Sequence, residues 1–346
     1  MPPLLISERE LLNFVPHPFY ENAEIQTFLA KQDGVIVGRI AAIIDHGHNA
    51  FHKEQRGMFG FFESVDDQQV ADALFNAAKD WFAAKEIHLM RGPANPSQNY
   101  TWGLLVEGFH TPPKFMMTYN KEYYERLILN FGFKKAQDLY AFLGHVDMLE
   151  NLDPKLNFVA DEAQRRFNVK VRPISKKHFA KDVESFLKIY NEALPGQWGF
   201  TPMTDGELRE IAKGLKQLIV PELTTMAEID GEPVATVFGL LDYNPLIKKA
   251  GGKLFQWGLP IGLLKILWGK RKIKTMRLIS TNVVPAYQGW GLGLVLLKRL
   301  VPEIKRWGIQ DAEFSWVLES NKLSRGTLER GGTKRDKTYR IYDYEP

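Results

Sequence analysis

The stretch VVPAYQGWGLGLVLLKRL, residues 283–300, decides the fold, because it places three glycines between an apolar strand and a helix. Gly289, Gly291 and Gly293 lie in the turn. Glycine has no Cβ and adopts positive φ at little cost, so such a turn can direct several backbone N–H groups inward. The following helix adds its own free N–H groups and the positive end of its dipole. The stretch predicts either a cradle for a phosphate or diphosphate or, with equal weight, a tight turn that only permits close helix–strand packing.

Two other glycine-rich phosphate motifs fit this stretch poorly. No Lys-Ser or Lys-Thr pair follows the glycines, so the P-loop of nucleoside triphosphatases is excluded. The glycines also come late in the chain, and no acidic residue ends the next strand as a dinucleotide-binding fold requires.

The composition is that of a globular protein with a full core: 346 residues, of which 45% are hydrophobic and 25% charged. The chain has no cysteine, which excludes disulfides, a thiolate nucleophile and a cysteine zinc site. A net charge of +4 is weak support for a polyanionic partner. The uncharged run Ile279–Leu297 reaches membrane-spanning length but contains proline, glycines and several polar residues, so we expect no spanning helix. The N-terminus lacks a signal-peptide pattern, and we expect a cytoplasmic protein.

The apolar pattern divides the chain into two halves with a similar order of elements. In the first half, residues 34–44 predict a strand pair or a strand and a turn, and we expect strands over 58–64, 87–93 and 138–146 and helices over 66–85 and 119–133. The second half predicts a strand, two helices, a hairpin around Asp230-Gly231, and then strand, helix, strand, helix, strand. The predicted class is α/β with two tandem domains, each a mixed sheet flanked by helices. Their expected bounds are 1–147 and 169–346, joined by a connecting helix over 148–168.

The second half resembles the GNAT superfamily of acyl-CoA-dependent N-acyltransferases. Gln288, Gly291 and Gly293 match the family signature Gln/Arg-x-x-Gly-x-Gly/Ala, which holds the diphosphate of coenzyme A. A second family pattern, around a short helix, is matched by Asn321, Ser324, Thr327, Leu328 and Gly332. The resemblance covers the whole second half.

The first half resembles a degenerate GNAT domain through Asn120, Tyr123, Tyr124, Gly132 and Phe133. Its corresponding turn has no glycines and places Asp66 and Asp67 where a diphosphate would bind. Like charge would repel that group, so we expect no coenzyme A in the first half. The whole chain then resembles tandem-GNAT bacterial proteins, a resemblance that brings no substrate with it.

The resemblance implies a set of residues that contact acetyl-CoA or another acyl-CoA along the strand end, the glycine turn and the short helix: Val283, Val284, Gln288, Gly289, Trp290, Gly291, Leu292, Gly293, Asn321 and Ser324. It also implies that a backbone N–H near Val283 and Val284 polarises the thioester carbonyl. For Asn321, we favour a hydrogen bond to the coenzyme over a helix cap.

An acid and a base remain to be assigned for proton transfer. The usual family tyrosine is replaced by Leu328, so Tyr339 and Tyr342 are candidate acids, with ordinary strand packing as the alternative. Glu319 is the candidate base because it ends the strand beside the expected cleft, and a salt-bridge role is at least as plausible.

Three polar or basic segments have less specific interpretations. Residues 246–274 mix bulky apolar residues with many Lys and Arg, which is typical of a lid, of an interfacial segment that meets anionic lipid, or of a helical hairpin packed on the domain. His46 and His48 could bind a metal with Asp45, but we expect a polar surface loop and no metal. Residues 91–109 form a polar loop whose Asn95, Asn99 and Glu107 could face the other domain, although hydrogen bonding within the loop is slightly favoured.

The function we expect is transfer of an acyl group, acetyl by family resemblance, from acyl-CoA to a small-molecule or peptide amine by the second half. A CoA-binding or scaffold protein without catalysis is an alternative that the missing tyrosine favours. A peripheral membrane binder acting through 246–274 is a second alternative. No nucleic-acid module is present in the sequence, so we expect no nucleic-acid partner.

Overall fold

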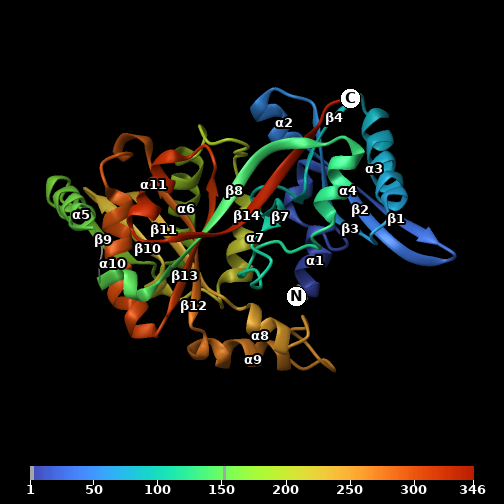
Figure 1. Ribbon diagram of the computed structural model, residues 1–346. Helices are drawn as coiled ribbons and strands as arrows, with labels where there is room; N and C mark the ends of the chain where they lie inside the picture. The colour runs from blue at the N-terminus through green and yellow to red at the C-terminus, as the bar shows by residue number, and fades with distance from the viewer. Residues whose placement is uncertain (1–3, 151–152) are drawn as a thin grey trace.

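The computed structural model describes residues 4–150 and 153–346, and nearly all its strands join one continuous mixed sheet (Figure 1). The first half supplies β1 (Ala23–Gln32), β2 (Val35–Asp45), β3 (Arg56–Ser64), β4 (Leu89–Gly92), β7 (Leu104–Glu107) and β8 (Lys134–His145). The second half supplies β9 (Lys170–Pro173), β10 (Thr225–Ile229), β11 (Glu232–Leu241), β12 (Thr275–Val283), β13 (Asp311–Leu318) and β14 (Lys334–Tyr344). The order is β1-β2-β3-β4-β14-β8-β13-β12-β11-β10-β9, with β7 also paired to β14.

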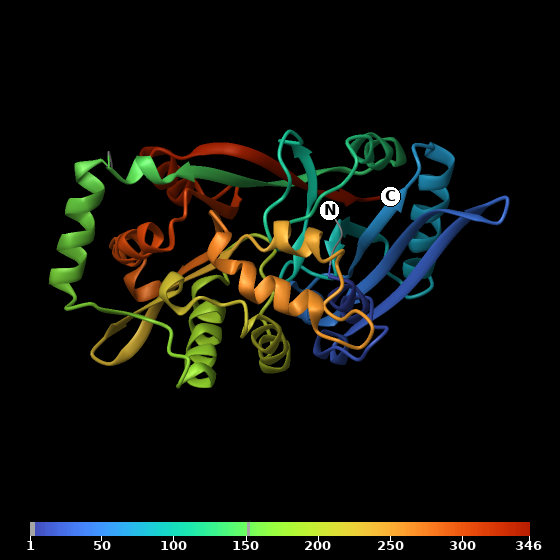
Figure 2. The same ribbon diagram turned by 90° about the horizontal axis from the view of Figure 1, so that it is seen from below.

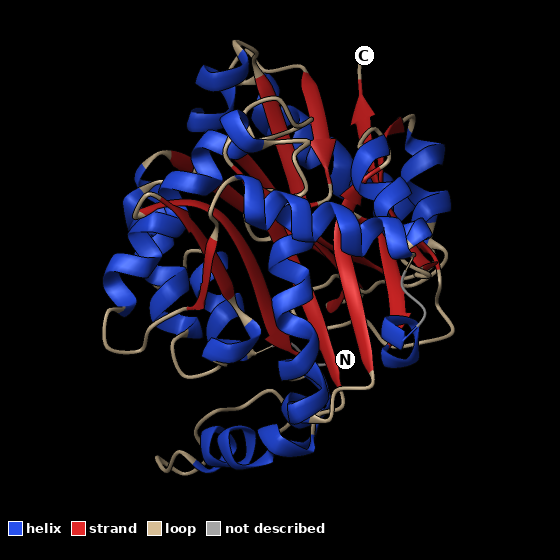
Figure 3. Ribbon diagram, turned by 90° about the vertical axis from the view of Figure 1, so that its left-hand side faces the viewer, coloured by secondary structure: helices blue, strands red, loops and turns tan. Residues whose placement is uncertain are grey.

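Helices cover both faces of this sheet (Figure 3). The first half contains α1 (Leu5–Leu11), α2 (His46–His52), α3 (Gln68–Ala83) and α4 (Tyr124–Phe131). The second contains α5 (Pro154–Arg166), α6 (Phe179–Ala193), α7 (Asp205–Leu215), α8 (Asn244–Lys249), α9 (Ile261–Gly269), α10 (Leu292–Trp307) and α11 (Lys322–Arg330). The predicted α/β class, with a mixed sheet and flanking helices, is confirmed.

The two halves exchange strands at the centre of the sheet. β8 of the first half pairs with β13 of the second, with Phe142 opposite Phe314. β14 of the second half pairs with β4 of the first, with Asp343 opposite Arg91. Figures 1 and 2 show β8 and β14 side by side, crossing from one half to the other. Neither half therefore completes its sheet from its own residues.

Several local expectations need correction. β1 was not predicted, and the polar loop after β4 contains the short strands β5 (Ala94–Asn95) and β6 (Thr101–Trp102) as well as β7. The expected surface loop at His46 and His48 is wrong, because both lie in α2 and His48 is buried. The His48 ring lies 2.9 Å from Thr201 Oγ1 and 2.8 Å from Glu54 Oε1, so it links the two halves. Within the described ranges, no group of three metal-ligating side chains converges.

Candidate active site

A wedge opens between β12 and β13, which lie in parallel only from Thr275 opposite Asp311 to Leu278 opposite Phe314. Each strand then shifts register against its outer neighbour, β12 at Ile279 and β13 between Phe314 and Val317. Such bulges bend a strand and disrupt its ladder. Beyond this point β12 follows β11 and β13 follows β8, so the strand ends separate.

The glycine turn lies at the end of β12 and leads directly into α10. Gly289 has φ 77° and Gly291 has φ 86°, and Gly291 is the N-cap of α10 with no side-chain cap. The backbone N–H groups of residues 289–293 donate to no acceptor among the described residues. Free amides at a helix N-terminus, next to backbone that only glycine adopts easily, suit a diphosphate. The residues present therefore fit the coenzyme that the motif implies.

The corresponding helix of the first half, α3, begins differently. Its N-cap Asp67 accepts a hydrogen bond from Gln69 N at 2.8 Å, and Asp66 is paired with Arg126. The protein's own carboxylates thus occupy the α3 N-terminus, whereas the α10 N-terminus has none. This contrast supports the expectation that only the second half carries a diphosphate site.

One wall of the glycine turn comes from α5 and the residue after it. A Cβ built on Gly291 would lie 2.6 Å from Val159 Cγ1, so α5 packs directly on the turn. Trp290 contacts the Phe167 ring at 5.5 Å, and the Arg166 guanidinium lies 4.3 Å from the Trp290 ring centroid. Arg166 adds positive charge beside the turn. No motif in the connecting segment indicated this residue.

The strand end and the residue Gln288 form a small hydrogen-bonded unit. Val284 N donates to Val234 O at 3.0 Å, so this amide is not available to a substrate. Because successive residues of an antiparallel strand face alternate neighbours, the Val283 amide points toward the wedge. The Gln288 side chain donates to Val283 O at 2.9 Å and to Ala193 O at 3.1 Å. It therefore ties the glycine turn to β12 and α6.

Four more residues predicted to contact the coenzyme, Asn321, Ser324, Leu292 and Gly293, take part in contacts within the protein. Asn321 Oδ1 accepts from Ser324 N at 3.0 Å and caps α11. The structure thus contains the helix cap, and the hydrogen bond from Asn321 to the coenzyme stays a prediction. Leu292 is buried, and a Cβ on Gly293 would lie 3.3 Å from Thr281 Cγ2, so helix and strand approach closely here.

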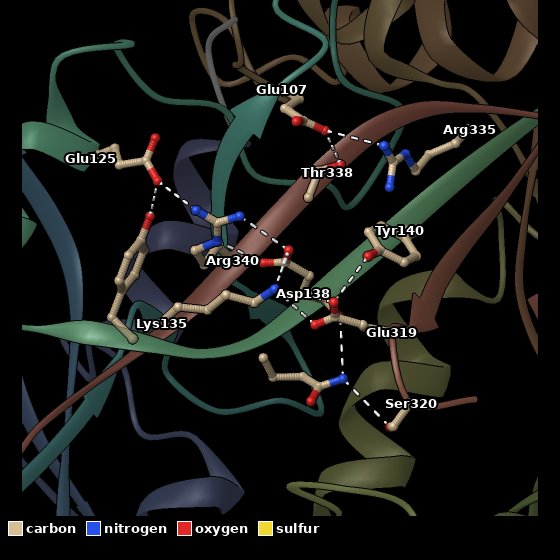
Figure 4. A network of polar contacts seen from close by, with 12 residues as sticks. Glu107, Glu125, Lys135, Asp138, Tyr140, Glu319, Ser320, Arg335, Thr338 and Arg340 are labelled. Atoms are coloured by element: carbon tan, nitrogen blue, oxygen red, sulfur yellow. Dashed lines mark hydrogen bonds and ion pairs between the residues drawn. The ribbon is translucent and has the colours of Figure 1, made fainter. Parts of the chain in front are cut away.

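Glu319 belongs to a polar network that crosses β8 and β14 (Figure 4). Tyr342 joins this network through Glu125, which also pairs with Arg340. Glu319 forms an ion pair with Lys135 at 2.9 Å, and Lys135 also pairs with Asp138 at 2.8 Å. Tyr342 donates to Glu125 Oε1 at 2.7 Å and packs in the core of the first half. Tyr342 lies at the end of β14 that pairs with the first half, opposite Gly92 of β4 and Lys135 of β8, so the structure does not bring it to the wedge.

Tyr339 is buried near a charged cluster that the sequence analysis did not single out. Arg277 of β12 lies opposite Glu313 of β13, and Arg277 donates to Ser315 Oγ at 2.9 Å. Ser315 Oγ also donates to Glu313 Oε1 at 2.7 Å. Glu313 Oε2 and the Tyr339 hydroxyl have no hydrogen-bond partner among the described residues. A charged residue at the centre of each apolar strand was the signal that could have indicated this cluster.

Burial sets the protonation of this cluster. It raises the pKa of Glu313, which Arg277 partly offsets, and it lowers the pKa of Arg277 to about 10. Burial also raises the pKa of Tyr339 well above its ordinary value, with a further contribution from Glu313. Tyr339 therefore keeps its proton at neutral pH, and Glu313 holds a proton more readily than an exposed carboxyl group.

Two apolar cavities lie beside the sheet of the second half. The first, of about 100 Å³, lies between α10, α11 and β13 and is lined by residues including Leu278, Leu294, Leu297, Ile304, Phe314 and Leu328. The second, of about 70 Å³, lies on the other face between α6, α7 and β11, with Phe179, Val183, Phe186, Ile211, Leu215 and Phe238. Most of the lining side chains are hydrocarbon or aromatic, with a few polar ones such as Lys298 in the first cavity and Asp182 in the second, and such linings suit a ligand with an apolar part.

For the loop over 91–109, the sequence left open whether its polar residues face the second half or bond within the loop. Asn99 accepts from Tyr190 at 2.7 Å and donates to Thr201 O at 3.3 Å, so it does reach the second half. Asn95 accepts from Phe61 N at 2.6 Å and Glu107 from Thr338 Oγ1 at 2.6 Å.

Comparison with solved structures identifies the same fold. A GCN5-related N-acetyltransferase from Sphaerobacter thermophilus aligns with a TM-score of 0.52 at 13% identity, over 92% of this chain and 80% of its own. A tandem GNAT protein from the clavulanic acid biosynthesis pathway aligns with a TM-score of 0.51 at 10% identity, over 98% of this chain and 87% of its own. At these identities the likeness concerns the fold alone. No family model matches the chain.

Two curated proteins are similar over nearly the whole chain. Protein YghO of Escherichia coli (strain K12) is 34% identical over 99% of this chain and 87% of its own length. Bacterial ceramide synthase of Caulobacter vibrioides is 34% identical over 99% of this chain and 89% of its own length. With its acyltransferase-type, tandem GNAT fold, the chain therefore belongs to the family that contains these two proteins.

Proposed function

We propose that the second half transfers an acyl group from acyl-CoA to the amine of a long-chain amphiphile. The observation that carries this proposal is the set of free amides at residues 289–293, beside the wedge and next to an uncapped helix N-terminus. In this proposal those amides bind the coenzyme diphosphate, and Arg166 adds to the positive potential around it. Bound acyl-CoA supplies an acyl thioester, whose acyl group is transferred to the amine.

The chain's own groups have distinct proposed roles in that step. The Val283 N–H, which points into the wedge, donates to the developing oxyanion. The amine nitrogen forms a bond to the carbonyl carbon, the carbon–sulfur bond breaks, and the thiolate must gain a proton as the amine loses one. Tyr339 is the candidate acid because its hydroxyl is buried and has no hydrogen-bond partner among the described residues, so it is free to donate. Glu319, the first candidate base, forms an ion pair with Lys135, and Glu313 is a second candidate for this role.

The nature of the two substrates is suggested by the two apolar cavities on opposite faces of the sheet. One relative is named a ceramide synthase, and a ceramide is an amide that joins two long hydrocarbon chains. The first cavity, which reaches Leu278 and Phe314 where β12 and β13 begin to separate, offers a space to the acyl chain, and the second, at Phe238 of β11, offers one to the chain of the amine. The family resemblance alone favours acetyl, whereas the first cavity favours a longer acyl group.

The test separates the charge of the glycine turn from its backbone conformation. Asn and Asp both tolerate positive φ better than other side chains, and a Cβ on Gly289 meets nothing within 4 Å. Gly289→Asp places a carboxylate beside the bound diphosphate, and Gly289→Asn is its neutral match. We expect Gly289→Asp to weaken coenzyme A binding in calorimetry by about tenfold or more relative to Gly289→Asn, since like charges a few ångströms apart repel.

Activity is then measured by mass spectrometry of the amide. The purified chain is given acetyl-CoA or palmitoyl-CoA, together with a simple amine or a long-chain amino alcohol. We expect amide from palmitoyl-CoA and the long-chain acceptor. Equal binding of coenzyme A by the Asp and Asn variants would refute the diphosphate site. Normal binding with no amide from any pair would favour the non-catalytic alternative, which the absence of a tyrosine at Leu328 already suggests.

A further inference from the structure

The segment 246–274, called here the basic insertion, connects β11 to β12 and is not used by the proposed chemistry. It contains most of α8, the whole of α9 and the turn between them, and it forms the lowest part of the molecule in Figures 1 and 3. It has no Asp or Glu. Its basic residues are Lys248, Lys249, Lys253, Lys265, Lys270, Arg271, Lys272 and Lys274.

The basic insertion exposes large apolar side chains that a globular protein normally buries. Trp257 is 91% exposed and Trp268 is 78% exposed. Trp257 and Gly258 form the tip of a tight turn, because Gln256 and Leu259 exchange two backbone hydrogen bonds of 2.9 Å on either side of them. Phe255 and Leu259, which flank this tip, are 56% and 59% exposed. A rigid tip with several exposed apolar groups marks an interaction surface.

The lysines of the basic insertion differ from most of the protein's other charged groups in their surroundings. Among the described residues, no carboxylate forms an ion pair with any lysine of the basic insertion. Lys248, Lys249, Lys253 and Lys265 are all exposed. Exposed tryptophans beside unpaired lysines match the interface of a bilayer with anionic lipids, where indole rings lie at the headgroup level and ammonium groups contact phosphates.

The basic insertion also lies at a defined place relative to the first apolar cavity. The Arg271 guanidinium lies 3.7 Å from the Trp307 ring centroid at the end of α10, and Gln310 N donates to Lys274 O at 2.7 Å. Gln310 and Ile309 are among the residues that line that cavity. On its other side the basic insertion meets α1, where Leu5 N donates to Gly252 O at 3.1 Å, and Leu5 and Ile6 are each 47% exposed.

We propose that the basic insertion, with the start of α1 beside it, docks this protein on the surface of a membrane that contains anionic lipid. In this orientation Trp257 and Trp268 enter the headgroup region and the lysines contact lipid phosphates. The end of the cavity at Ile309 and Gln310 then faces the membrane side of the molecule. The docking surface is independent of the proposed acyl transfer, because none of its residues contacts the glycine turn or the wedge.

The experiment is sedimentation of the full chain with vesicles of phosphatidylcholine alone or of phosphatidylcholine with phosphatidylglycerol, at low and at high salt. One variant carries Trp257→Ala and Trp268→Ala, and its control carries Val35→Ala and Ile36→Ala, which are 64% and 58% exposed in the first half. A second variant changes Lys248, Lys249, Lys253 and Lys265 to Gln. Its control makes the same change at four exposed lysines outside the basic insertion: Lys31, Lys53, Lys121 and Lys134.

We expect binding to the anionic vesicles, loss of that binding at high salt, and affinities at least about tenfold lower for both variants in the basic insertion. The two controls should change affinity by less than about threefold, since surface charge elsewhere acts only weakly through the screened solvent. No binding to anionic vesicles at low salt would overturn the proposal. Equal losses in the variants and their controls would also overturn it, as would equal binding to the neutral vesicles.

Discussion

Replacing Gly291 by alanine tests the geometry of the glycine turn directly. Gly291 has φ 86°, and its new Cβ would lie 2.6 Å from Val159 Cγ1 of α5. The left-handed backbone costs an L-residue about 1–2 kcal/mol. Overpacking against α5 adds about 1–3 kcal/mol. We therefore expect Gly291→Ala to lower the free energy of unfolding by about 2–5 kcal/mol.

The two costs separate in a double-mutant cycle with Val159→Ala. In that background the nearest atom to the new Cβ becomes Val159 O at 3.3 Å, so the side-chain clash is gone and mainly the backbone cost remains. Val159 is 39% exposed, so its own truncation should cost only about 1 kcal/mol. The double variant should be more stable than the sum of the single effects by about 1–3 kcal/mol.

The assay is urea unfolding followed by circular dichroism, with the slope and midpoint fitted for each variant. Gly289→Ala is the matched control, because Gly289 also has positive φ but its Cβ would meet nothing within 4 Å. It should cost about 1–2 kcal/mol and show no coupling to Val159→Ala. A coupling below about 0.5 kcal/mol for Gly291 would refute the packing of α5 on the turn.

Three further predictions concern the buried polar groups. Tyr342→Phe should lower the free energy of unfolding in urea by about 1 kcal/mol, because it removes the hydrogen bond to Glu125, and should leave amide formation intact. Tyr339→Phe should leave the free energy of unfolding unchanged, because its hydroxyl has no hydrogen-bond partner among the described residues, and should reduce amide formation by about a hundredfold if Tyr339 is the acid. A rate unchanged in Tyr339→Phe would remove it from the mechanism. Glu313→Leu should lower stability by about 3–5 kcal/mol, because the buried charge of Arg277 loses the nearby carboxylate that offsets it. The double variant with Arg277→Met should be less damaged than the single one, and an additive loss would contradict the coupling of the two charges. The hydrogen bond from His48 and the charge of Arg56 lower the pKa of Glu54 to about 2. The ionised Glu54 therefore stabilises the folded state above its ordinary pKa of 4.5, and this stabilisation is lost as the pH falls from 4.5 toward 2. The difference in urea midpoint between the natural chain and Glu54→Gln should therefore shrink between pH 5 and about 3, and a constant difference would count against this pairing.

The features that the sequence predicted well are those encoded locally. Pro285, the glycines and the apolar spacing after them predict the end of β12 and the start of α10, since each acts through its own backbone. β1 was missed because its side chains are largely exposed and its apolar residues do not alternate clearly. The helix at His46 was missed because seven residues are too few to show a helical period.

The features that the sequence did not predict depend on distant partners. The sequences of β8 and β14 do not indicate which strands they pair with, because their alternating pattern suits a neighbour from either half. The pairing of Arg277 with Glu313 depends on the parallel register of β12 and β13. Arg166 reaches the glycine turn only because α5 packs on α10, which a helical pattern cannot specify.

The exchanged strands make the order of synthesis matter. β14 leaves the ribosome after every other strand of the sheet, yet it fills the position between β4 and β8. Until then both neighbours present unpaired N–H and C=O groups, which is a template for pairing with another chain. The sheet therefore stays open between β4 and β8 until residues 334–344 have been synthesised. Cutting the chain between its two halves would leave an unpaired sheet edge on each of them.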